Sequence, residues 1–354
     1  MKSTLLKLTC LFALAVPVNI AVAQENVRVG WCTTSFNAFT SPFAVAKKMG
    51  YDVEEGITVD LVPVASGSDC VKFIATGEFN YAVPSIEPLA SIVAQGLEAA
   101  EFYNFYSGTG FGIAVPVDSD IKTIADLRGK KIGVLSLTAV GYSVARGLVK
   151  SEGMNPDADV TIVNVGETQR AALALQNHEV DAISLFETAH IAIGSLIGGI
   201  RMLDAPALIG APQGGFVSTA SYFADHKPEA VALGRMYSKA SAFIAANPSA
   251  ALDILYETYP QLVPTGRDLA EVKALDLEIL ERRLKVWDPA VTGASGWGEI
   301  NEDDFNRYLA LMADWGMTSR LVTADEFTTN ELIGQINDFD QAAIAEQAKA
   351  YPSK

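Results

Sequence analysis

The chain has 354 residues, of which 49% are hydrophobic, and a formal net charge of −16 at pH 7. This length is sufficient for two domains with separate hydrophobic cores. The negative charge argues against nucleic-acid binding, because phosphate recognition needs clustered lysine and arginine residues. A charge of this sign keeps a protein in solution and by itself indicates no particular partner.

The first 23 residues have the pattern of a bacterial secretory signal. Lys2 and Lys7 form a positively charged start, residues 8–20 are apolar, and the next three residues read Ala-Val-Ala, a typical cleavage site. The apolar stretch is shorter than the roughly 20 residues that span a bilayer. We therefore expect cleavage after Ala23 and a periplasmic location. A membrane anchor or a buried first helix is the alternative.

Two cysteines, Cys32 and Cys70, follow the predicted signal sequence. In an oxidising compartment an even number of cysteines suggests a disulfide. Buried free cysteines are also common in protein cores. The sequence therefore leaves a bonded pair and two free thiols open as alternatives.

Short apolar strands alternate with helices along the first part of the chain, a pattern typical of open, mostly parallel α/β sheets. In a first series we expect strands at 27–31, 57–64, 81–84 and 99–105, and helices at 42–49, 71–74 and 87–95. In a second series we expect strands at 113–116, 131–135, 160–165 and 182–185, and helices at 142–152 and 168–176. The last third is helical, and apolar faces at 233–243 and 305–312 are expected to pack in the core.

Two clusters rich in glycine or proline, at residues 107–112 and 210–215, separate these series. We interpret them as the edges of an inserted domain. Residues 24–112 and 214–354 would form lobe 1, and residues 113–213 would form lobe 2. Because the chain would cross twice between the lobes, this organisation predicts a hinged cleft, where small ligands bind.

The sequence contains none of the common catalytic or cofactor motifs. The three histidines, at positions 178, 190 and 226, lack a zinc-type partner four residues on, and no C-x-x-C, Walker or G-x-S-x-G pattern occurs. The glycines of residues 108–112 lead into a strand rather than a helix, which disfavours dinucleotide binding. We therefore expect no cofactor, no metal site and no enzymatic activity.

Hydroxyl and glycine residues recur where the predicted strands end. In open α/β sheets, ligands lie beyond the carboxyl ends of the strands. Hydroxyls and helix N-termini suit a small anion or a polar head group, although each such residue also fits ordinary helix capping. Their recurrence at five strand ends favours a binding site. The candidate residues are Thr34, Ser35, Ser66, Gly67, Ser68, Ser85, Ser136 and Thr138.

Aromatic and acidic residues complete the candidate site. Trp31 and Phe36 adjoin the first of these loops, either as core residues or as a stacking wall for a ligand. Glu187 is the one acid predicted at the floor of the cleft, where it would pair with an ammonium group or accept an N–H. A solvated turn is the alternative for Glu187.

Several short motifs occur in a specific order along the chain. They are residues 73–78 (FIATGE), 126–134 (DLRGKKIGV), 153–156 (GMNP), 179–182 (EVDA) and 225–231 (DHKPEAV). Through them the chain resembles the periplasmic solute-binding proteins of ABC importers for taurine, alkanesulfonates, nitrate and thiamine-pyrimidine precursors, the NMT1/THI5-like family. The resemblance covers nearly all of residues 27–320.

The resemblance implies a type II periplasmic binding protein of two lobes, each an open sheet with flanking helices. Such a protein closes on one small molecule and docks on a membrane permease, and we expect it to be a monomer. The resemblance matches the lobe 1 hydroxyl loops named above, and in lobe 2 it matches Thr138 and adds Tyr142 to the candidate site.

The chain also departs from the family pattern in lobe 2. Ala139, Val140 and Gly141 stand where taurine binders are rich in threonine and histidine, and Phe186 replaces a usual tryptophan. These changes suit an amphipathic or aromatic ligand at least as well as taurine. Two alternative functions remain: an exported enzyme of pyrimidine or cofactor metabolism, and a ligand sensor for a membrane receptor. Fungal synthases related by this resemblance use a cysteine-rich iron motif, and the chain has no such run of cysteines.

Overall fold

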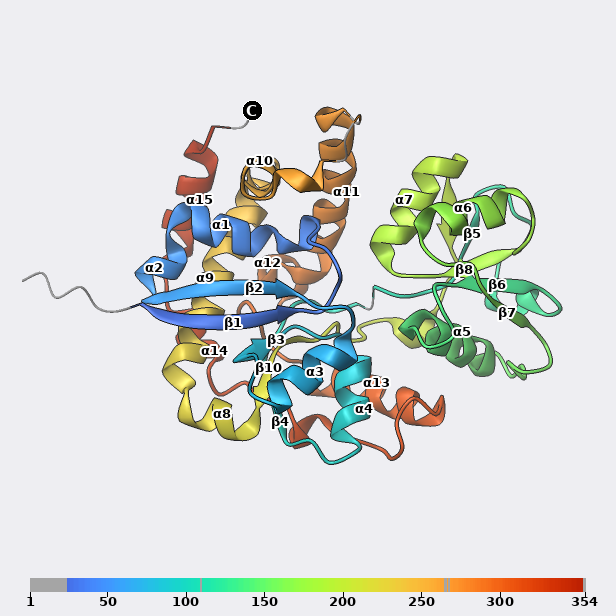
Figure 1. Cartoon of the computed structure of the whole chain (residues 1–354), viewed down its shortest axis with the longest axis horizontal. Helices are drawn as coiled ribbons and strands as arrows, with labels where there is room; N and C mark the ends of the chain where they lie inside the picture. Colours follow the sequence, from blue (N-terminus) through green and yellow to red (C-terminus); the bar gives the residue numbers. More distant parts are fainter. Residues whose placement is uncertain (1–23, 109, 264–265, 267, 353–354) are drawn as a thin grey trace, which may run out of the picture.

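The computed structural model describes residues 24–108, 110–263, 266 and 268–352, so the predicted signal sequence lies outside the described residues. Two five-stranded sheets with flanking helices form two lobes that lie side by side along the molecule (Figure 1). Within the described ranges, no helix is long and apolar enough to cross a membrane. The two-lobed α/β fold confirms the predicted fold class, and the exact lobe boundaries stay a prediction.

Lobe 1 is built on a sheet of order β2-β1-β3-β10-β4. Its strands are β1 (Glu25–Trp31), β2 (Ile57–Pro63), β3 (Tyr81–Ala82), β4 (Ala99–Asn104) and β10 (Gly215–Thr219). The helices that precede the crossing to lobe 2 are η1 (Ala38–Thr40), α1 (Ser41–Met49), α2 (Tyr51–Glu54), α3 (Gly67–Ala75) and α4 (Ile86–Val93). The helices that follow the return of the chain to lobe 1 are α8 (Ala220–Asp225), α9 (Lys227–Ala246), α10 (Pro248–Thr258), η4 (Pro260–Leu262), α11 (Leu269–Trp287), α12 (Pro289–Thr292), α13 (Glu302–Asp314), η5 (Ala324–Glu326), α14 (Ile333–Ile336) and α15 (Gln341–Ala350).

Lobe 2 is built on a sheet of order β7-β6-β8-β5-β9. Its strands are β5 (Ala114–Pro116), β6 (Lys131–Val134), β7 (Thr161–Asn164), β8 (Ala182–Ser184) and β9 (Ile200–Met202). Its helices are η2 (Ile124–Leu127), α5 (Val140–Ser151), α6 (Thr168–Gln176), α7 (Glu187–Ile197) and η3 (Pro206–Leu208). Each strand and helix expected from the sequence is present, with ends that differ by a few residues. The helix expected at 71–74 starts earlier, because the Ser66 side chain caps it.

One strand in each sheet runs against its neighbours. β10 is antiparallel to β3 and β4, and β5 is antiparallel to β8 and β9. Each is the first strand after the chain crosses from the other lobe. Each therefore begins at the edge where the parallel strands of its sheet end. Both crossings consequently lie at the carboxyl edges of the parallel strands, where open α/β sheets bind ligands.

The two crossing segments, residues 105–108 and 211–214, run next to each other, and we expect them to act as the hinge between the lobes. Ser107 and Pro212 pair in an antiparallel bridge. The N–H of Gly108 donates to the carbonyl of Ala211 at 2.6 Å, and the N–H of Gln213 donates to the carbonyl of Tyr106 at 3.2 Å. We refer to these two stretches as the hinge segments.

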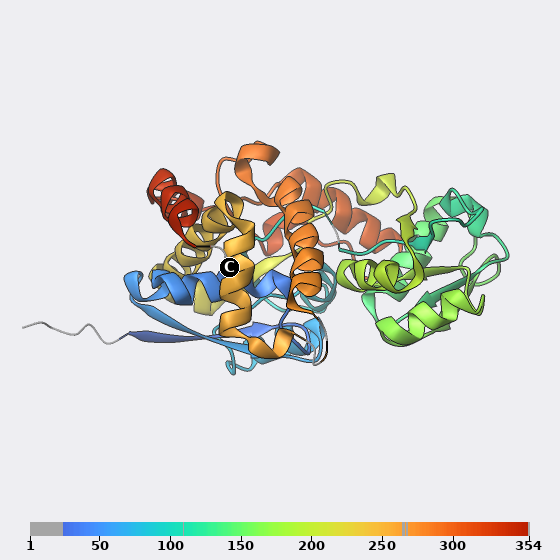
Figure 2. The ribbon, with the colours of Figure 1, turned by 90° about the horizontal axis from the view of Figure 1, so that it is seen from above.

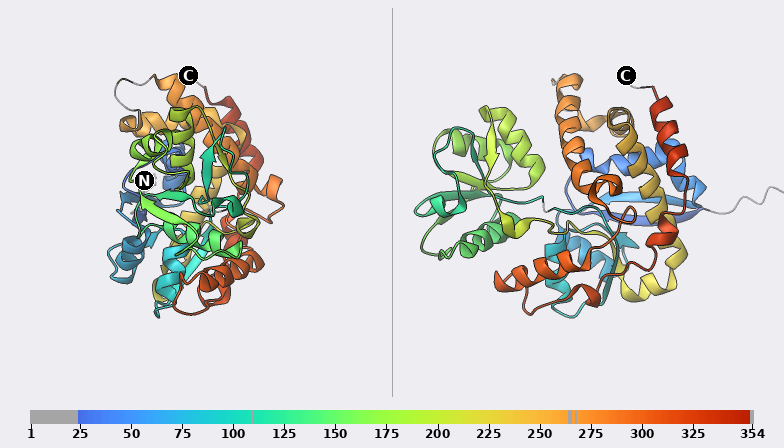
Figure 3. Two further views of the ribbon diagram at one scale, coloured as in Figure 1. Left: turned by 90° about the vertical axis from the view of Figure 1, so that its right-hand side faces the viewer. Right: turned by 180° about the vertical axis from the view of Figure 1, so that it is seen from behind.

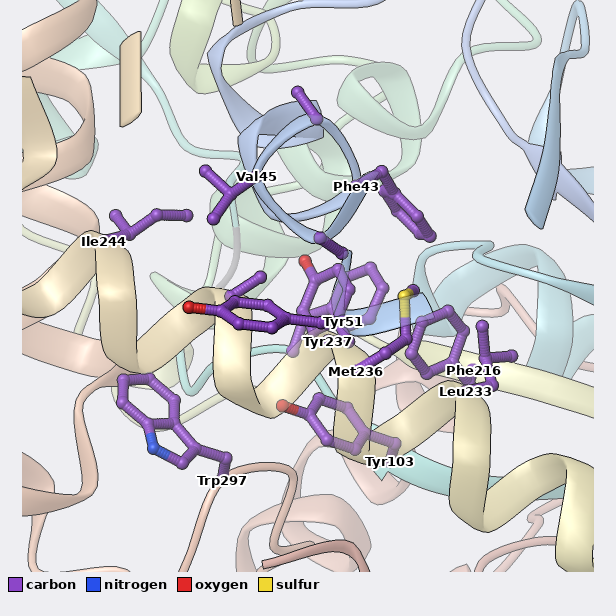
Figure 4. Close-up of a cluster of buried hydrophobic side chains, with 14 of the residues drawn as sticks. Phe43, Val45, Tyr51, Tyr103, Phe216, Leu233, Met236, Tyr237, Ile244 and Trp297 are labelled. Atoms are coloured by element: carbon purple, nitrogen blue, oxygen red, sulfur yellow. The ribbon is translucent and has the colours of Figure 1, made fainter. Parts of the chain in front are cut away.

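The core of lobe 1 is rich in aromatic side chains. Phe105 stacks on Tyr237 with ring centres 4.7 Å apart, and Phe216 packs edge-on against Tyr237 at 5.2 Å. Figure 4 shows this cluster, to which α1 contributes Phe43 and α9 contributes Tyr237. The apolar faces predicted at 233–243 and 305–312 are buried, which confirms their packing role.

One helix of lobe 1 also reaches lobe 2. α13 is anchored by Tyr308, whose hydroxyl donates to the buried Glu87 at 2.8 Å. At the end of this helix the indole N–H of Trp315 donates to Ser151 Oγ of α5 at 3.2 Å. The view from behind shows α13 beside α5 (Figure 3). The lobes are therefore joined by packing as well as by the hinge segments.

Candidate functional site

The loops at the carboxyl ends of the strands lie between the two lobes. β1 and β2 are parallel and run toward lobe 2, so the loops after them lie at the edge of lobe 1 that faces lobe 2 (Figure 1). Phe39, which follows β1, contacts Phe186, which follows β8, with ring centres 6.2 Å apart in an edge-on geometry. The two sets of strand ends therefore meet at this pair of rings.

Phe186 is held in place by the stretch that follows the first hinge segment. Its ring centre lies 5.3 Å from that of Phe111. A Cβ atom at Gly110 would lie 2.5 Å from the Phe186 ring, so this close approach requires a glycine. Phe186 thus contacts lobe 1 through Phe39 and the stretch after the first hinge segment through Phe111.

The loop after β1 is stabilised by its own hydrogen bonds. Trp31 is buried, and its indole N–H donates to the carbonyl of Ser35 at 3.2 Å. Thr34 and Ser35 are exposed. Phe36 is half-buried and packs on Tyr259 with ring centres 4.6 Å apart. The buried Trp31 therefore stabilises the conformation of this loop, whereas the side chains of Thr34 and Ser35 are exposed to solvent.

The loop after β2 is attached to the first loop by a covalent bond. Cys32 and Cys70 form a disulfide with Cα atoms 5.8 Å apart. Ser66 caps α3 by accepting the Asp69 N–H at 3.1 Å, and Ser68 is exposed. Of the two alternatives that the sequence left open for the cysteines, the structure has the bonded pair.

Two close contacts fix the positions of Gly67 and Ser85. A Cβ atom at Gly67 would lie 2.6 Å from the Pro88 side chain, so only glycine fits here without displacing α4. Ser85 is half-buried, directly before α4, and its side chain hydrogen-bonds to Glu87. Burial raises the pKa of the Glu87 carboxyl above its ordinary value, and the hydrogen bonds oppose this shift.

The loop after β6 combines hydroxyl groups with apolar side chains. Ser136 Oγ and Thr138 Oγ1 lie 3.2 Å apart. Leu135 and Leu137 of the same loop are 45% and 54% exposed, respectively. This edge of lobe 2 therefore presents apolar and hydroxyl surface together, as expected for an amphipathic ligand.

Tyr142, in the first turn of α5, lies against another residue of its own helix. The guanidinium of Arg146 lies 5.5 Å from the Tyr142 ring centre, and its Nη1 donates to the Tyr142 hydroxyl at 3.4 Å. Next to it, a Cβ atom at Gly141 would lie 2.3 Å from the Ser184 carbonyl oxygen. The lack of a side chain at Gly141 thus permits close packing of α5 on β8.

Glu187 begins α7 and faces α11 of lobe 1. Its carboxylate lies 3.9 Å from the Arg282 guanidinium, and its side chain is 24% exposed. A cavity of about 720 Å³ is lined by residues of both helices, which adjoin each other where the lobes meet (Figure 2). Its lining includes Phe111, Glu187, His190, Leu275, Glu278 and Arg282. This volume is within the range of small-molecule sites.

His190 supports the turn that carries Phe186 and Glu187. It is 3% exposed, and its Nε2 accepts the Leu185 N–H at 3.1 Å. Burial, and to a smaller extent the nearby Arg282 charge, lower the pKa of His190 to about 4. The imidazole is therefore neutral at pH 7, as this hydrogen bond requires.

The structure adds one site residue that the sequence analysis missed. Arg283 of α11 is 7% exposed, and its guanidinium carbon lies 3.4 Å from the ring centre of Phe39 and 3.3 Å from that of Tyr106. Tyr106 is fixed by its hydroxyl, which donates to Gln213 Oε1 at 2.9 Å across the hinge. A cation thus lies between two aromatic rings at the junction of the lobes.

The candidate residues are brought together within each lobe. Lobe 1 places its three hydroxyl loops along one edge, and lobe 2 pairs Ser136 with Thr138, while Glu187 lies beside α11. In the part of the chain that the structure describes, no cluster of three or more His, Cys, Asp or Glu residues forms a metal site.

A comparison with known families places the chain in one of them. The family model described as NMT1/THI5 like matches residues 37–251, more than half of the chain. The chain belongs to this family. A curated relative, the 4-amino-5-hydroxymethyl-2-methylpyrimidine phosphate synthase of Legionella pneumophila, is 22% identical over 245 residues, which are 68% of this chain and 75% of the relative.

Solved structures share the fold of this NMT1/THI5-like protein. The periplasmic aliphatic sulphonate binding protein SsuA from Escherichia coli superposes with a TM-score of 0.66 at 15% identity, covering 85% of this chain and 91% of SsuA. The periplasmic nitrate-binding protein NrtA from Synechocystis PCC 6803 gives a TM-score of 0.61 at 14% identity, covering 93% of this chain and 99% of NrtA. At these identities the likeness establishes a periplasmic-binding-protein fold and leaves the ligand open.

Proposed function

We propose that this protein is the periplasmic substrate-binding component of an ABC importer, which captures a small organic solute between its lobes and delivers it to a membrane permease. The observation that carries the proposal is the meeting of strand ends from both sheets at one hinge, where Phe39 of lobe 1 contacts Phe186 of lobe 2. A ligand that binds the closed arrangement more tightly shifts the population toward it.

Two classes of solute fit the residues at the strand ends. Exposed hydroxyls such as Ser68 and Thr138 suit the head group of a sulfonate or a taurine-like compound. The exposed Leu137 and the half-buried Phe186 suit an aromatic or pyrimidine-like compound. Export through the predicted signal sequence would place this capture in the periplasm, next to the permease.

A thermal-shift screen of residues 24–354 tests the proposal. The panel contains taurine, alkanesulfonates, nitrate, aromatic carboxylates and pyrimidines. We expect one class to raise the melting temperature in a concentration-dependent way, because a ligand that binds only the folded state stabilises it. The bound compound should be recovered unchanged, and small-angle scattering should show a more compact molecule with ligand. If no compound in an extended solute panel binds, the transport proposal is wrong.

A second candidate is an exported enzyme of pyrimidine metabolism, because the Legionella relative is named as a pyrimidine phosphate synthase. Mass spectrometry of the protein incubated with candidate substrates distinguishes the two functions. Formation of a pyrimidine phosphate would support the enzyme, whereas binding without chemical change supports the importer component. A sensor role would be favoured by a receptor gene, rather than permease and ATPase genes, beside this one.

A further inference from the structure

The side chain of Arg283 carries a buried charge that forms no hydrogen bond or ion pair with the described residues. It is 7% exposed, and its Nε and Nη2 are buried without a hydrogen-bond partner. Stacking on Phe39 and Tyr106 covers the faces of the guanidinium and gives no hydrogen-bond acceptor to Nε or Nη2 at its edge. Burying a charged donor without an acceptor is costly, and an acceptor on a bound ligand would remove that cost.

A second unsatisfied donor lies on the same face of α11. Trp287 follows Arg283 by one helical turn, is 8% exposed, and its indole N–H is buried without a partner. The main chain of this helix is attached to the hinge, because the N–H of Ser107 donates to the carbonyl of Val286 at 3.0 Å. This face of α11 therefore places the hydrogen-bond donors of Arg283 and Trp287 next to the hinge segments.

The charged groups around Arg283 do not neutralise it in this arrangement. Glu187 is close enough to act on Arg283 electrostatically, but its carboxylate lies by Arg282, at 3.9 Å. The other neighbours that act on Arg283 are the phenol groups of Tyr106 and Tyr237. Burial raises the pKa of both phenols, so they stay neutral at pH 7.

The surroundings of this cation are aromatic rather than polar. Phe36, Phe111 and Phe186 are half-buried at the strand ends and the hinge, and therefore keep ring surface that the protein does not cover. Flat rings pack against such surfaces edge-on or offset. A cavity of about 720 Å³ adjoins this cluster; its lining includes Phe111, Glu187 and Arg282, the neighbour of Arg283 in α11, but not Arg283 itself.

We propose that the solute is a planar organic acid, whose carboxylate or sulfonate is bound by Arg283 while its ring packs against the phenylalanines at the lobe junction. This inference rests on the proposed binding function and adds to it the chemical class of the ligand. Arg283 suits this role because its planar fork binds carboxylate and sulfonate-type oxygens with two parallel hydrogen bonds.

Isothermal titration calorimetry with benzoate, benzenesulfonate and the neutral isostere benzamide tests the proposal. We expect the wild-type protein to bind at least one of the two acids at least about tenfold more tightly than benzamide. Arg283→Met should abolish this preference. The control Lys285→Met removes one positive charge from the exposed side of the same helix and should leave the preference unchanged.

Each outcome bears on one proposal. If the wild-type protein prefers an acid but Arg283→Met keeps that preference, the assignment of Arg283 is wrong while the binding function stands. If a neutral pyrimidine or taurine binds and neither acid does, the ligand class is wrong. If no solute binds, the importer proposal itself fails. If Arg283→Met does not fold, Arg283→Lys replaces it as the test. This variant keeps the positive charge but lacks the planar guanidinium, so it should lower affinity for the acids more than for benzamide.

Discussion

The indole of Trp315 packs directly on the backbone of Gly147. A Cβ atom at Gly147 would lie 2.0 Å from Trp315 Cδ2, a distance at which one of the two helices must move. Because Trp315 follows α13 of lobe 1 and Gly147 belongs to α5 of lobe 2, this contact sets the distance between the lobes away from the hinge.

Gly147→Ala should therefore destabilise the protein, even though alanine favours a helix. Overpacking of this kind costs about 1–3 kcal/mol, against a gain of at most about 1 kcal/mol in helix propensity. Thermal unfolding should give a lower melting temperature, and small-angle scattering should give a changed radius of gyration. The matched control is Gly334→Ala in α14, where nothing lies within 4 Å of an added Cβ. Equal melting temperatures for both variants would contradict the packing argument.

Reduction of the Cys32–Cys70 disulfide should lower the free energy of unfolding. The bond closes a stretch with a sequence separation of 38 and joins the loop after β1 to α3. Loss of one such bridge typically costs about 2–4 kcal/mol. Denaturant unfolding with and without dithiothreitol measures the difference. The variant with both cysteines replaced by serine should be less stable than the wild type and insensitive to the reductant. If dithiothreitol lowers the stability of that variant as well, the loss in the wild type does not come from the disulfide.

The stability of the protein should fall as pH rises above about 5, because of Glu101. This side chain is fully buried, neither carboxylate oxygen has a hydrogen-bond partner among the described residues, and burial raises its pKa well above the ordinary value of 4.5. The folded state therefore keeps a proton that the unfolded state releases, which lowers stability by up to about 1.4 kcal/mol per pH unit. Urea unfolding between pH 5 and 8 should show a smaller decline for Glu101→Gln. The exposed Glu98→Gln serves as the control, and identical slopes for Glu101→Gln and wild type would refute the expectation.

Thr138→Ala should weaken ligand binding by about 1 kcal/mol, the value of one neutral hydrogen bond. Thr138 Oγ1 lies 3.2 Å from Ser136 Oγ on the lobe 2 edge of the cleft. Calorimetry with whichever solute the screen identifies measures the effect. An unchanged affinity in a folded variant would remove Thr138 from the site without affecting the assignment of Arg283.

The parts of this molecule that follow from local pattern could be predicted from the sequence. Strands such as β1 and β6 are short apolar runs, and α9 has a clear apolar face, so their positions follow from periodicity. Phe186 could be singled out because it departs from a family pattern at a strand end. The candidate hydroxyl residues likewise stand out because they lie at strand ends. Their role in binding stays a prediction.

Arg283 and Glu101 could not be predicted in the same way. Arg283 lies four residues from both Ile279 and Trp287 on the buried face of α11, so helical spacing could have marked it as inward-facing, whereas its stacking on two distant aromatic rings could not be predicted. Glu101 lies in a strand where alternation allows an exposed side chain. It is covered because the segment after η5 pairs with β4, through a bridge between Glu101 and Thr328. The surroundings of both side chains depend on contacts between distant parts of the chain.

The two hinge segments are adjacent, and this fixes where any rotation of the lobes has its axis. Since Ser107 pairs with Pro212 at the edge where the strands end, the axis runs along the floor of the cleft. A displacement of a few tenths of an ångström beside Arg283 would grow in proportion to distance from that axis. The outer ends of the lobes would move most. Under the proposed importer function, a permease in contact with both ends could therefore distinguish an empty protein from a loaded one by their spacing alone.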